Sequence, residues 1–126
     1  MKQIGVLLCA ALLLTGCAAP IVRDAGLDRL AIRKAEQDLS AGLRAYDDGD
    51  YRNSARLLQS ALAAGLFLSS DKVAAHKHLA FMHCAQSRER ACRDEFRKAL
   101  DLNPNLELTP AESGHPLWGP VFKSLK

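Results

Sequence analysis

Two stretches of the sequence resemble each other at an offset of 38 positions, and this similarity restricts the possible folds more than any other feature. Self-similarity at a period of about 20 to 50 residues is typical of repeated supersecondary units. The first stretch runs from Ala41 to Leu62 and the second from Leu79 to Pro104. Matched positions keep their character: Gly42 with Ala80, Leu58 with Phe96, and Ala61-Leu62 with Ala99-Leu100. The sequence therefore predicts two copies of one small unit.

Apolar residues recur at spacings of three and four along both stretches, which predicts helices rather than strands. The first apolar stripe is Leu27, Leu30 or Ala31, Ala35, Leu39, Leu43 and Tyr46. Turn chemistry interrupts the period at residues 47–50, at Gly65 and at residues 103–105. We expect helices over residues 27–46, 51–64, 72–85 and 89–102, with the serines and the aspartate of residues 69–71 capping the third. The predicted fold class is all-α, with four helices in two hairpins.

The two hairpins resemble a pair of tetratricopeptide repeats. The resemblance rests on the Gly49-Asp50-Tyr51 turn, on the FRKALDLNP ending, and on small residues at equivalent positions: Gly42 and Ala80 in the first helices, Ser54 and Cys92 in the second. The repeats are degenerate, because Asp38 and His76 stand in place of tryptophan and Leu66 in place of proline. The resemblance covers about 70 residues. It implies a tetratricopeptide-like domain over residues 27–104, with a plain helical bundle as the alternative.

Residues 1–16 are predicted to be a signal peptide. Lys2 precedes an apolar run from Ile4 to Leu14, which is too short to cross a hydrocarbon core of about 30 Å as a helix. The Leu14-Thr15-Gly16-Cys17 sequence resembles the lipobox of bacterial lipoproteins. By this resemblance Cys17 becomes the first mature residue and carries a covalent lipid. The alternative is an ordinary signal peptide with a coincidental cysteine.

The lipobox resemblance also implies a location. Two or more acyl chains hold a protein firmly on a membrane, and Ala18 stands where an inner-membrane retention signal would have aspartate. We expect a lipid anchor in the outer membrane, a periplasmic domain, and no cofactor besides the lipid on Cys17. Residues 17–26 are expected to form a short tether that keeps the domain close to the membrane.

The cysteines of the mature chain are predicted to pair. Cys9 leaves with the signal peptide and Cys17 carries the lipid, so Cys84 and Cys92 remain. Thiols of an exported protein lie in an oxidising compartment. A disulfide between them would close a loop of about nine residues and stabilise the fold by about 2 to 3 kcal/mol.

The charge pattern does not favour nucleic-acid binding. The net charge of +3 comes from 17 basic and 14 acidic residues spread along the chain. The densest basic run, over residues 88–98, is interrupted by Glu89, Asp94 and Glu95. A phosphate-binding surface usually shows an uninterrupted basic face.

Candidate catalytic and metal-binding residues lack the spacing that such sites need. Neighbouring His83 and Cys84 would point about 100° apart on a helix. Glu112 and His115 have no second carboxylate or nucleophile beside them. The other candidates form no paired histidine or cysteine motif: His76, His78 and Cys92. We therefore predict neither an enzyme nor a metal site.

The tetratricopeptide resemblance implies a concave face that binds a protein partner. By this resemblance the face would carry Leu39, Leu43, Tyr46 and Phe81, with Glu36 and Lys77 at its edge. The alternative, for each apolar member, is a place in the hydrophobic core.

The C-terminal segment, residues 105–126, is predicted to cap the helices. Between Leu108 and Phe122 it contains three prolines, two glycines and the only tryptophan, Trp118. Disordered tails rarely contain aromatic residues. Trp118 is expected to cover the open apolar edge of the second hairpin; the alternative is an anchor for a partner, a role in which tryptophan is frequent.

Taken together, the lipobox, the repeats, Cys84 with Cys92, and the GHPLWGPVF ending resemble the TssQ family of small lipoproteins associated with type VI secretion. The resemblance implies a non-catalytic adaptor that binds a protein of an envelope assembly. One alternative is an assembly lipoprotein of a pilus or secretin system. Another is a periplasmic thiol-redox or metal-binding protein that uses Cys84, Cys92 and the histidines.

Overall fold

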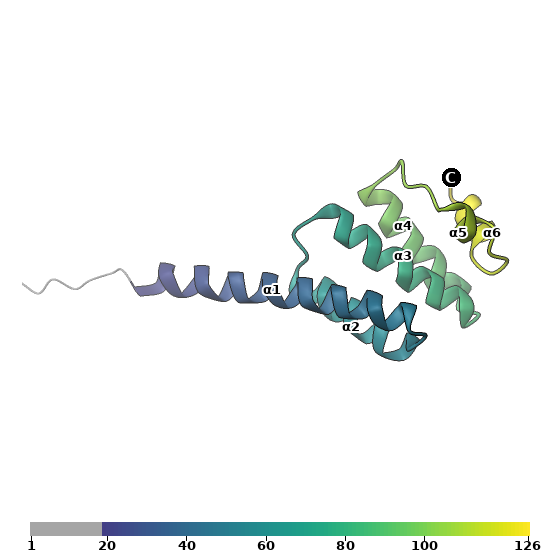
Figure 1. Cartoon of the computed structure of the whole chain (residues 1–126). Helices are drawn as coiled ribbons and strands as arrows, with labels where there is room; N and C mark the ends of the chain where they lie inside the picture. Colours follow the sequence, from purple (N-terminus) through teal and green to yellow (C-terminus); the bar gives the residue numbers. More distant parts are fainter. Residues whose placement is uncertain (1–18) are drawn as a thin grey trace, which may run out of the picture.

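A computed structural model describes residues 19–126, and these residues form an all-α fold (Figure 1). The fold class predicted from the sequence is confirmed, and the described part contains no strand. The predicted signal peptide and Cys17 lie outside the described residues. The helices are α1 (Ala19–Asp47), α2 (Tyr51–Ala64), α3 (Ser69–Ala85), α4 (Glu89–Leu102), α5 (Pro110–Ser113) and α6 (Gly119–Lys123).

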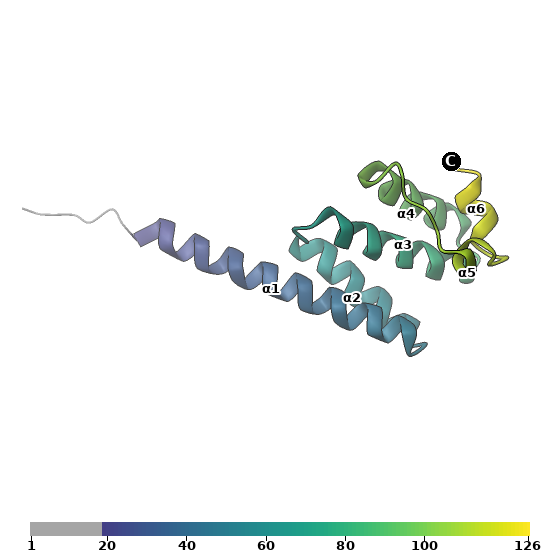
Figure 2. The ribbon, with the colours of Figure 1, turned by 45° about the horizontal axis from the view of Figure 1, so that its top comes forward.

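The four long helices form two hairpins, α1 with α2 and α3 with α4, and α2 and α3 bring the hairpins together (Figures 1 and 2). The turns of the two hairpins have the same backbone geometry. Gly49 and Ser87, at equivalent positions, both have a positive φ, of 81° and 60°. In each turn, the N–H of the following residue donates to the carbonyl five positions earlier. These hydrogen bonds run from Asp50 to Ala45 at 2.8 Å and from Arg88 to His83 at 2.9 Å. The internal similarity of the sequence therefore corresponds to a repeated backbone unit.

Close helix crossing depends on Gly42 in the first hairpin. A Cβ atom at this position would lie 2.8 Å from Cδ2 and 2.9 Å from Cγ of Leu58, which is fully buried. At the equivalent position of the second hairpin, Ala80 is also fully buried. The small residues predicted at these two positions therefore allow the helices to approach.

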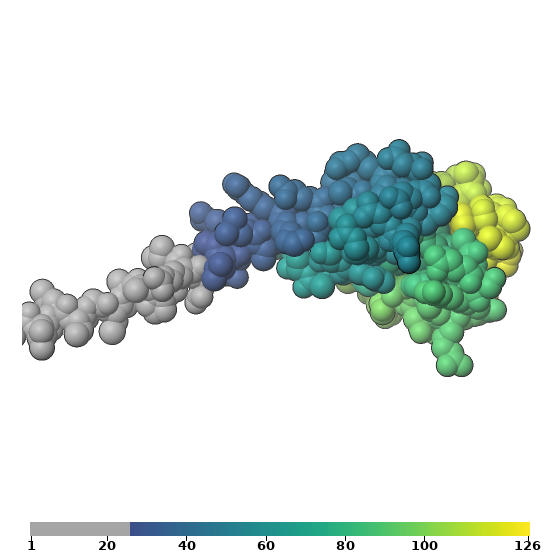
Figure 3. Space-filling view, turned by 90° about the horizontal axis from the view of Figure 1, so that it is seen from below, coloured from purple at the N-terminus to yellow at the C-terminus, as the bar shows by residue number. Residues whose placement is uncertain are grey.

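Helix α1 begins at Ala19, eight residues before the predicted start at Leu27. The segment expected to be a tether is thus helical from residue 19 onward. Pro20 does not prevent this, because it lies in the first turn, where proline is tolerated. Residues 26–34 are all exposed, and this part of α1 extends beyond the packed helices (Figure 3). Within residues 19–126, no helix has the length and the apolar character needed to cross a membrane.

Helix α3 begins at Ser69, three residues earlier than predicted. The N-cap is Leu68, which makes no side-chain capping bond, so the expected cap by residues 69–71 is wrong. Instead, the Leu68 carbonyl accepts the N–H groups of Asp71 and Lys72, each at 3.2 Å. The predicted bounds of α2 and α4 agree with the structure.

The core consists of two clusters of buried side chains. One lies between α1, α2 and α3 and comprises Ala35, Leu39, Leu58, Ala61, Leu66, Ala75, Leu79 and Met82. The other joins α3 and α4 to the C-terminal segment and comprises Ala80, Phe81, Cys84, Cys92, Phe96, Leu108 and Phe122. Because Leu108 and Phe122 belong to the second cluster, the C-terminal segment is part of the fold and covers the second hairpin, as predicted.

Candidate binding cleft

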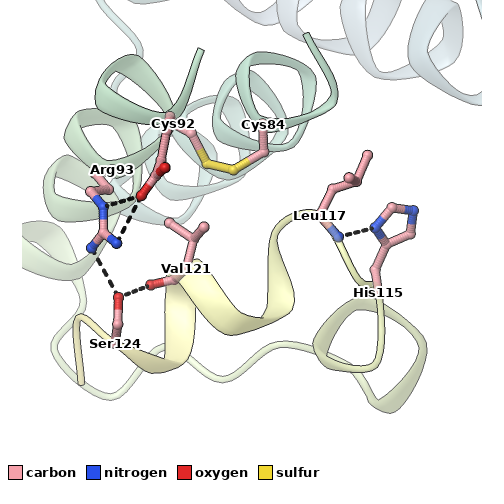
Figure 4. The surroundings of a disulfide bond; sticks show 8 residues. Cys84, Cys92, Arg93, His115, Leu117, Val121 and Ser124 are labelled. Atoms are coloured by element: carbon pink, nitrogen blue, oxygen red, sulfur yellow. Dashed lines mark hydrogen bonds and ion pairs between the residues drawn. A yellow bond between two sulfur atoms is a disulfide. The ribbon is translucent and has the colours of Figure 1, made fainter. Parts of the chain in front are cut away.

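A disulfide joins Cys84 at the end of α3 to Cys92 in α4, which confirms the predicted pair (Figure 4). Both residues are buried and belong to the second core cluster. The bond spans the turn between the two helices, and that turn lies beside the site described below. It therefore restrains the backbone that forms one wall of this site.

The C-terminal segment is held on α4 by polar and aromatic contacts. The Arg93 guanidinium donates to Ser124 Oγ at 2.9 Å and to Glu89 Oε1 at 3.0 and 3.1 Å (Figure 4). The ring of Phe122 packs edge-on against Phe96, with centroids 5.1 Å apart. These contacts hold α6 and the residue that follows it against α4.

Trp118 rests on aromatic rings from two sides. Its ring stacks on Phe81 with centroids 4.6 Å apart, and on the parallel ring of His115 at 3.4 Å. The Leu117 N–H donates to His115 Nδ1 at 3.2 Å, which orients the imidazole (Figure 4). Tyr46 of α1 reaches the same cluster, with its ring centroid 6.4 Å from that of Phe81. Residues far apart in the sequence thus build one aromatic wall.

This wall borders a cleft of about 340 Å³, here called the aromatic cleft. No charged side chain lines it. At its rim, the side chains of Tyr51 and Leu117 are 50% and 49% exposed. The lining residues are Tyr46, Tyr51, Phe81, Met82, Ala85, Gln86, His115, Leu117 and Trp118.

Burial keeps the polar groups beside the cleft neutral. Desolvation, with smaller effects of Tyr51, Glu112 and Asp47, raises the pKa of the Tyr46 phenol to about 12. Desolvation likewise lowers the pKa of His78, whose Nδ1–H donates to the Ala74 carbonyl at 2.7 Å. Near neutral pH these two groups are therefore uncharged, and the lining of the cleft is largely apolar.

Lys77, predicted at the edge of the binding face, forms an ion pair within the fold. Its Nζ lies 2.7 Å from Glu112 Oε1 and 5.7 Å from the centroid of the Phe81 ring. Burial acts to raise the pKa of Glu112, but the hydrogen bonds from Lys77 and the Thr109 N–H outweigh it, so this pKa is lowered. The ion pair ties α3 to the C-terminal segment behind the aromatic wall.

The structure separates the predicted binding residues into two groups. Tyr46, Phe81 and Trp118 meet at the cleft, with Phe81 buried as its floor. Leu39 belongs to the core and Leu43 packs against it. The core alternative therefore holds for Leu39, and Phe81 is likewise a member of the core. Leu43 is half-buried, and neither leucine lines the cleft.

Sequence reasoning missed Tyr51, His115 and Leu117 as members of the site. Tyr51 follows the turn that the repeat pattern identified, which places its side chain near the next hairpin. His115 and Leu117 belong to the unusual GHPLW sequence, where only the cluster of aromatic and proline residues indicated order. Across residues 19–126, no group of three or more His, Cys, Asp or Glu side chains is placed to hold a metal ion.

Comparisons with family models, with curated proteins and with solved structures found no match for this chain.

Proposed function

We propose that this protein is a lipid-anchored, non-catalytic adaptor that binds a segment of a partner protein in the aromatic cleft. The observation that carries the proposal is the cleft itself, formed where both hairpins and the C-terminal segment meet. Tyrosine and tryptophan are frequent energetic anchors of protein interfaces. A volume of about 340 Å³ is at the lower end for ligand sites. It suits one large apolar side chain and its neighbours.

In this proposal the lipid on Cys17 holds the adaptor at the outer membrane, with its helical domain in the periplasm. The partner belongs to a cell-envelope assembly, for which the resemblance to type VI secretion lipoproteins favours that apparatus over a pilus or secretin system. The burial of Cys84 and Cys92, which are 8% and 0% exposed, supports a structural disulfide over a thiol-redox centre.

A photo-crosslinking amino acid at Leu117 tests partner binding at the cleft. Leu117 lies half-exposed at the rim, so a reactive side chain there reaches a bound segment without disturbing the core. The matched control is the same substitution at Leu102, which is 38% exposed and does not line the cleft. In the native cell, we expect the Leu117 variant to form an adduct with an envelope protein, identified by mass spectrometry, and the Leu102 variant to form none. Equal adducts at both positions, or none at either, would contradict the proposal.

The anchor is tested by Cys17→Ser. A chain without acyl groups loses about 0.8 kcal/mol of membrane affinity for each methylene that would have been buried. We expect the wild-type protein to sediment with membranes and the variant to remain in the supernatant, whereas a Cys9→Ser variant should behave as wild type. A membrane-bound Cys17→Ser variant would show that the lipid is not the anchor.

A further inference from the structure

A second hollow adjoins the aromatic cleft. It has a volume of about 390 Å³ and lies between α2 and α3. Tyr51, Met82 and Gln86 line both hollows, so the two lie side by side and are together called the groove. Arg52 and Arg88 line only the second hollow, here called the basic lobe. Its lining residues are Tyr51, Arg52, Ala55, Gln59, Leu79, Met82, His83, Gln86 and Arg88.

The two arginines of the basic lobe have no acidic partner in the described part of the chain. By contrast, Arg93 and Arg97 of α4 are paired with Glu89 and Asp94. Guanidinium groups present several donors in a planar fork that matches a carboxylate. The basic lobe therefore offers two unpaired cationic groups at the edge of an apolar surface.

The charges around His83 are mixed in sign. Desolvation is the largest cause that lowers the pKa of His83. Glu95 opposes this effect, and both Arg88 and Lys98 add to it. The imidazole is therefore neutral near neutral pH, and the charge of the lobe comes from its arginines.

An acidic turn lies close in sequence to residues of both hollows. Asp47, Asp48 and Asp50 form the turn next to Tyr46 and Tyr51, and all three are exposed. The charge of Asp47 reaches Tyr46, whose pKa it helps to raise. Within residues 19–126, no acidic side chain lines either hollow, so the positive charge of the lining comes from Arg52 and Arg88.

We infer that the groove binds an extended peptide segment that places an apolar or aromatic side chain in the aromatic cleft and a carboxylate in the basic lobe. The inference rests on the proposed function and specifies the chemistry of the partner. Arg52 and Arg88 place the carboxylate, because they line the basic lobe and do not line the aromatic cleft. The carboxylate is that of an acidic side chain of the bound segment.

Trp118 provides the measurement, because it is the only tryptophan and its ring lines the aromatic cleft. We would titrate the full-length lipidated protein in detergent micelles with N-acetyl-Phe-Gly-Gly-Glu-amide and follow Trp118 fluorescence. We expect this peptide to bind about fivefold more tightly than its glutamine analogue and the lysine analogue to bind least, since partly exposed ion pairs contribute modestly to affinity. Salt should reduce the difference. The peptide N-acetyl-Phe-Gly-Gly with a free C-terminus tests a chain terminus as the source of the carboxylate. Tighter binding of this peptide than of the glutamate peptide would contradict the acidic side chain.

The double variant Arg52→Gln/Arg88→Gln tests the basic lobe. It should abolish the preference for the glutamate peptide and leave binding of the glutamine peptide unchanged. The matched control is Arg90→Gln, since Arg90 is exposed and lines neither part of the groove.

Two results would overturn the inference: equal affinity for the glutamate, glutamine and lysine peptides, or no fluorescence change with any of them. Neither depends on the crosslinking at Leu117, which tests the proposed function. If Leu117 formed an adduct while the three peptides bound equally, the proposed adaptor function would stand and the acidic ligand would be rejected.

Discussion

At the scale of single residues, Gly42 has the most stringent steric requirement. A methyl group there would have to displace Leu58, which is fully buried in the first core cluster. Overpacking a core costs about 1 to 3 kcal/mol, whereas replacing a helical glycine by alanine gains about 0.5 to 1 kcal/mol. We therefore expect Gly42→Ala to lower the free energy of unfolding by about 1 to 2 kcal/mol, measured by urea denaturation with circular dichroism.

Gly26 provides the matched control in the same helix. A Cβ atom at Gly26 would meet nothing within 4 Å. Gly26→Ala should therefore leave the unfolding midpoint unchanged or slightly raised. If Gly42→Ala were as stable as Gly26→Ala, the crossing of α1 and α2 would not need the glycine.

Glu95 gives the stability of the fold a pH dependence. Its carboxylate joins α3 to α4 through His76 Nδ1 at 2.6 Å and also accepts a hydrogen bond from Lys98 at 2.7 Å. Burial acts to raise the pKa of Glu95, but these two partners outweigh it and lower the pKa below its usual value of 4.5. A carboxyl group whose pKa is lowered by folding contributes its full stabilisation at any pH above its pKa in the unfolded chain. This contribution is lost as the pH falls through the pKa of the group in the folded protein.

We therefore expect the melting temperature of the wild-type protein to fall as the pH drops below about 4.5. Glu95→Gln should lower the melting temperature at neutral pH and flatten this acid dependence. Glu107→Gln is the control, because Glu107 is 79% exposed and its loss should change neither quantity appreciably. If the melting temperature of Glu95→Gln fell equally steeply with decreasing pH, the acid dependence would come from other carboxyl groups.

At the scale of elements, local signals determined which bounds could be predicted. The bounds of α2 followed from the turn at residues 47–50 and from Gly65, whose φ of 95° suits glycine. The start of α1 could not be predicted, because residues 19–26 continue the helix without a regular apolar stripe and Pro20 fits its first turn. Only part of the lining of the cleft was predicted. The contact between Phe81 and Trp118 depends on how the chain folds back after α4, and the apolar spacing along the helices carries no information about that path.

The disulfide acts on the α3–α4 turn, and that turn lines the groove through Ala85, Gln86 and Arg88. The equivalent of Cys92 in the first hairpin is Ser54, which is fully buried without a disulfide. The hairpin backbone therefore does not require the bond. We expect Cys84→Ala/Cys92→Ala to fold with a free energy of unfolding lower by about 2 to 3 kcal/mol. It should also bind the glutamate peptide more weakly, because the turn is less restrained.

Reduction of the wild-type protein provides the control for this pair of substitutions. Urea denaturation with reductant should give the same loss of stability as the double variant. A double variant as stable as the oxidised wild-type protein would show that the bond does not stabilise the fold.

At the scale of the whole molecule, α1 sets the distance between the proposed anchor and the groove. The helix begins at Ala19, near the proposed lipidation site, and Tyr46 near its other end lines the aromatic cleft. At 1.5 Å per residue this separation is about 40 Å. A short flexible tether would have kept the groove near the membrane, whereas a helix continuous from Ala19 can hold it well away. The exposed part of α1 is therefore a spacer in the proposed adaptor.

Deleting residues 27–33 tests the spacer, because all seven are exposed and the packed part of α1 begins at Ala35. The deletion removes about two helical turns, or about 10 Å, and nearly preserves the helical register. We expect unchanged stability and membrane sedimentation but a weaker Leu117 adduct, because the cleft no longer reaches a partner segment held at a fixed height. Replacing residues 27–33 with an alanine-rich helix of equal length should retain the adduct. If the deletion retains it as well, the length of α1 does not determine what the groove reaches.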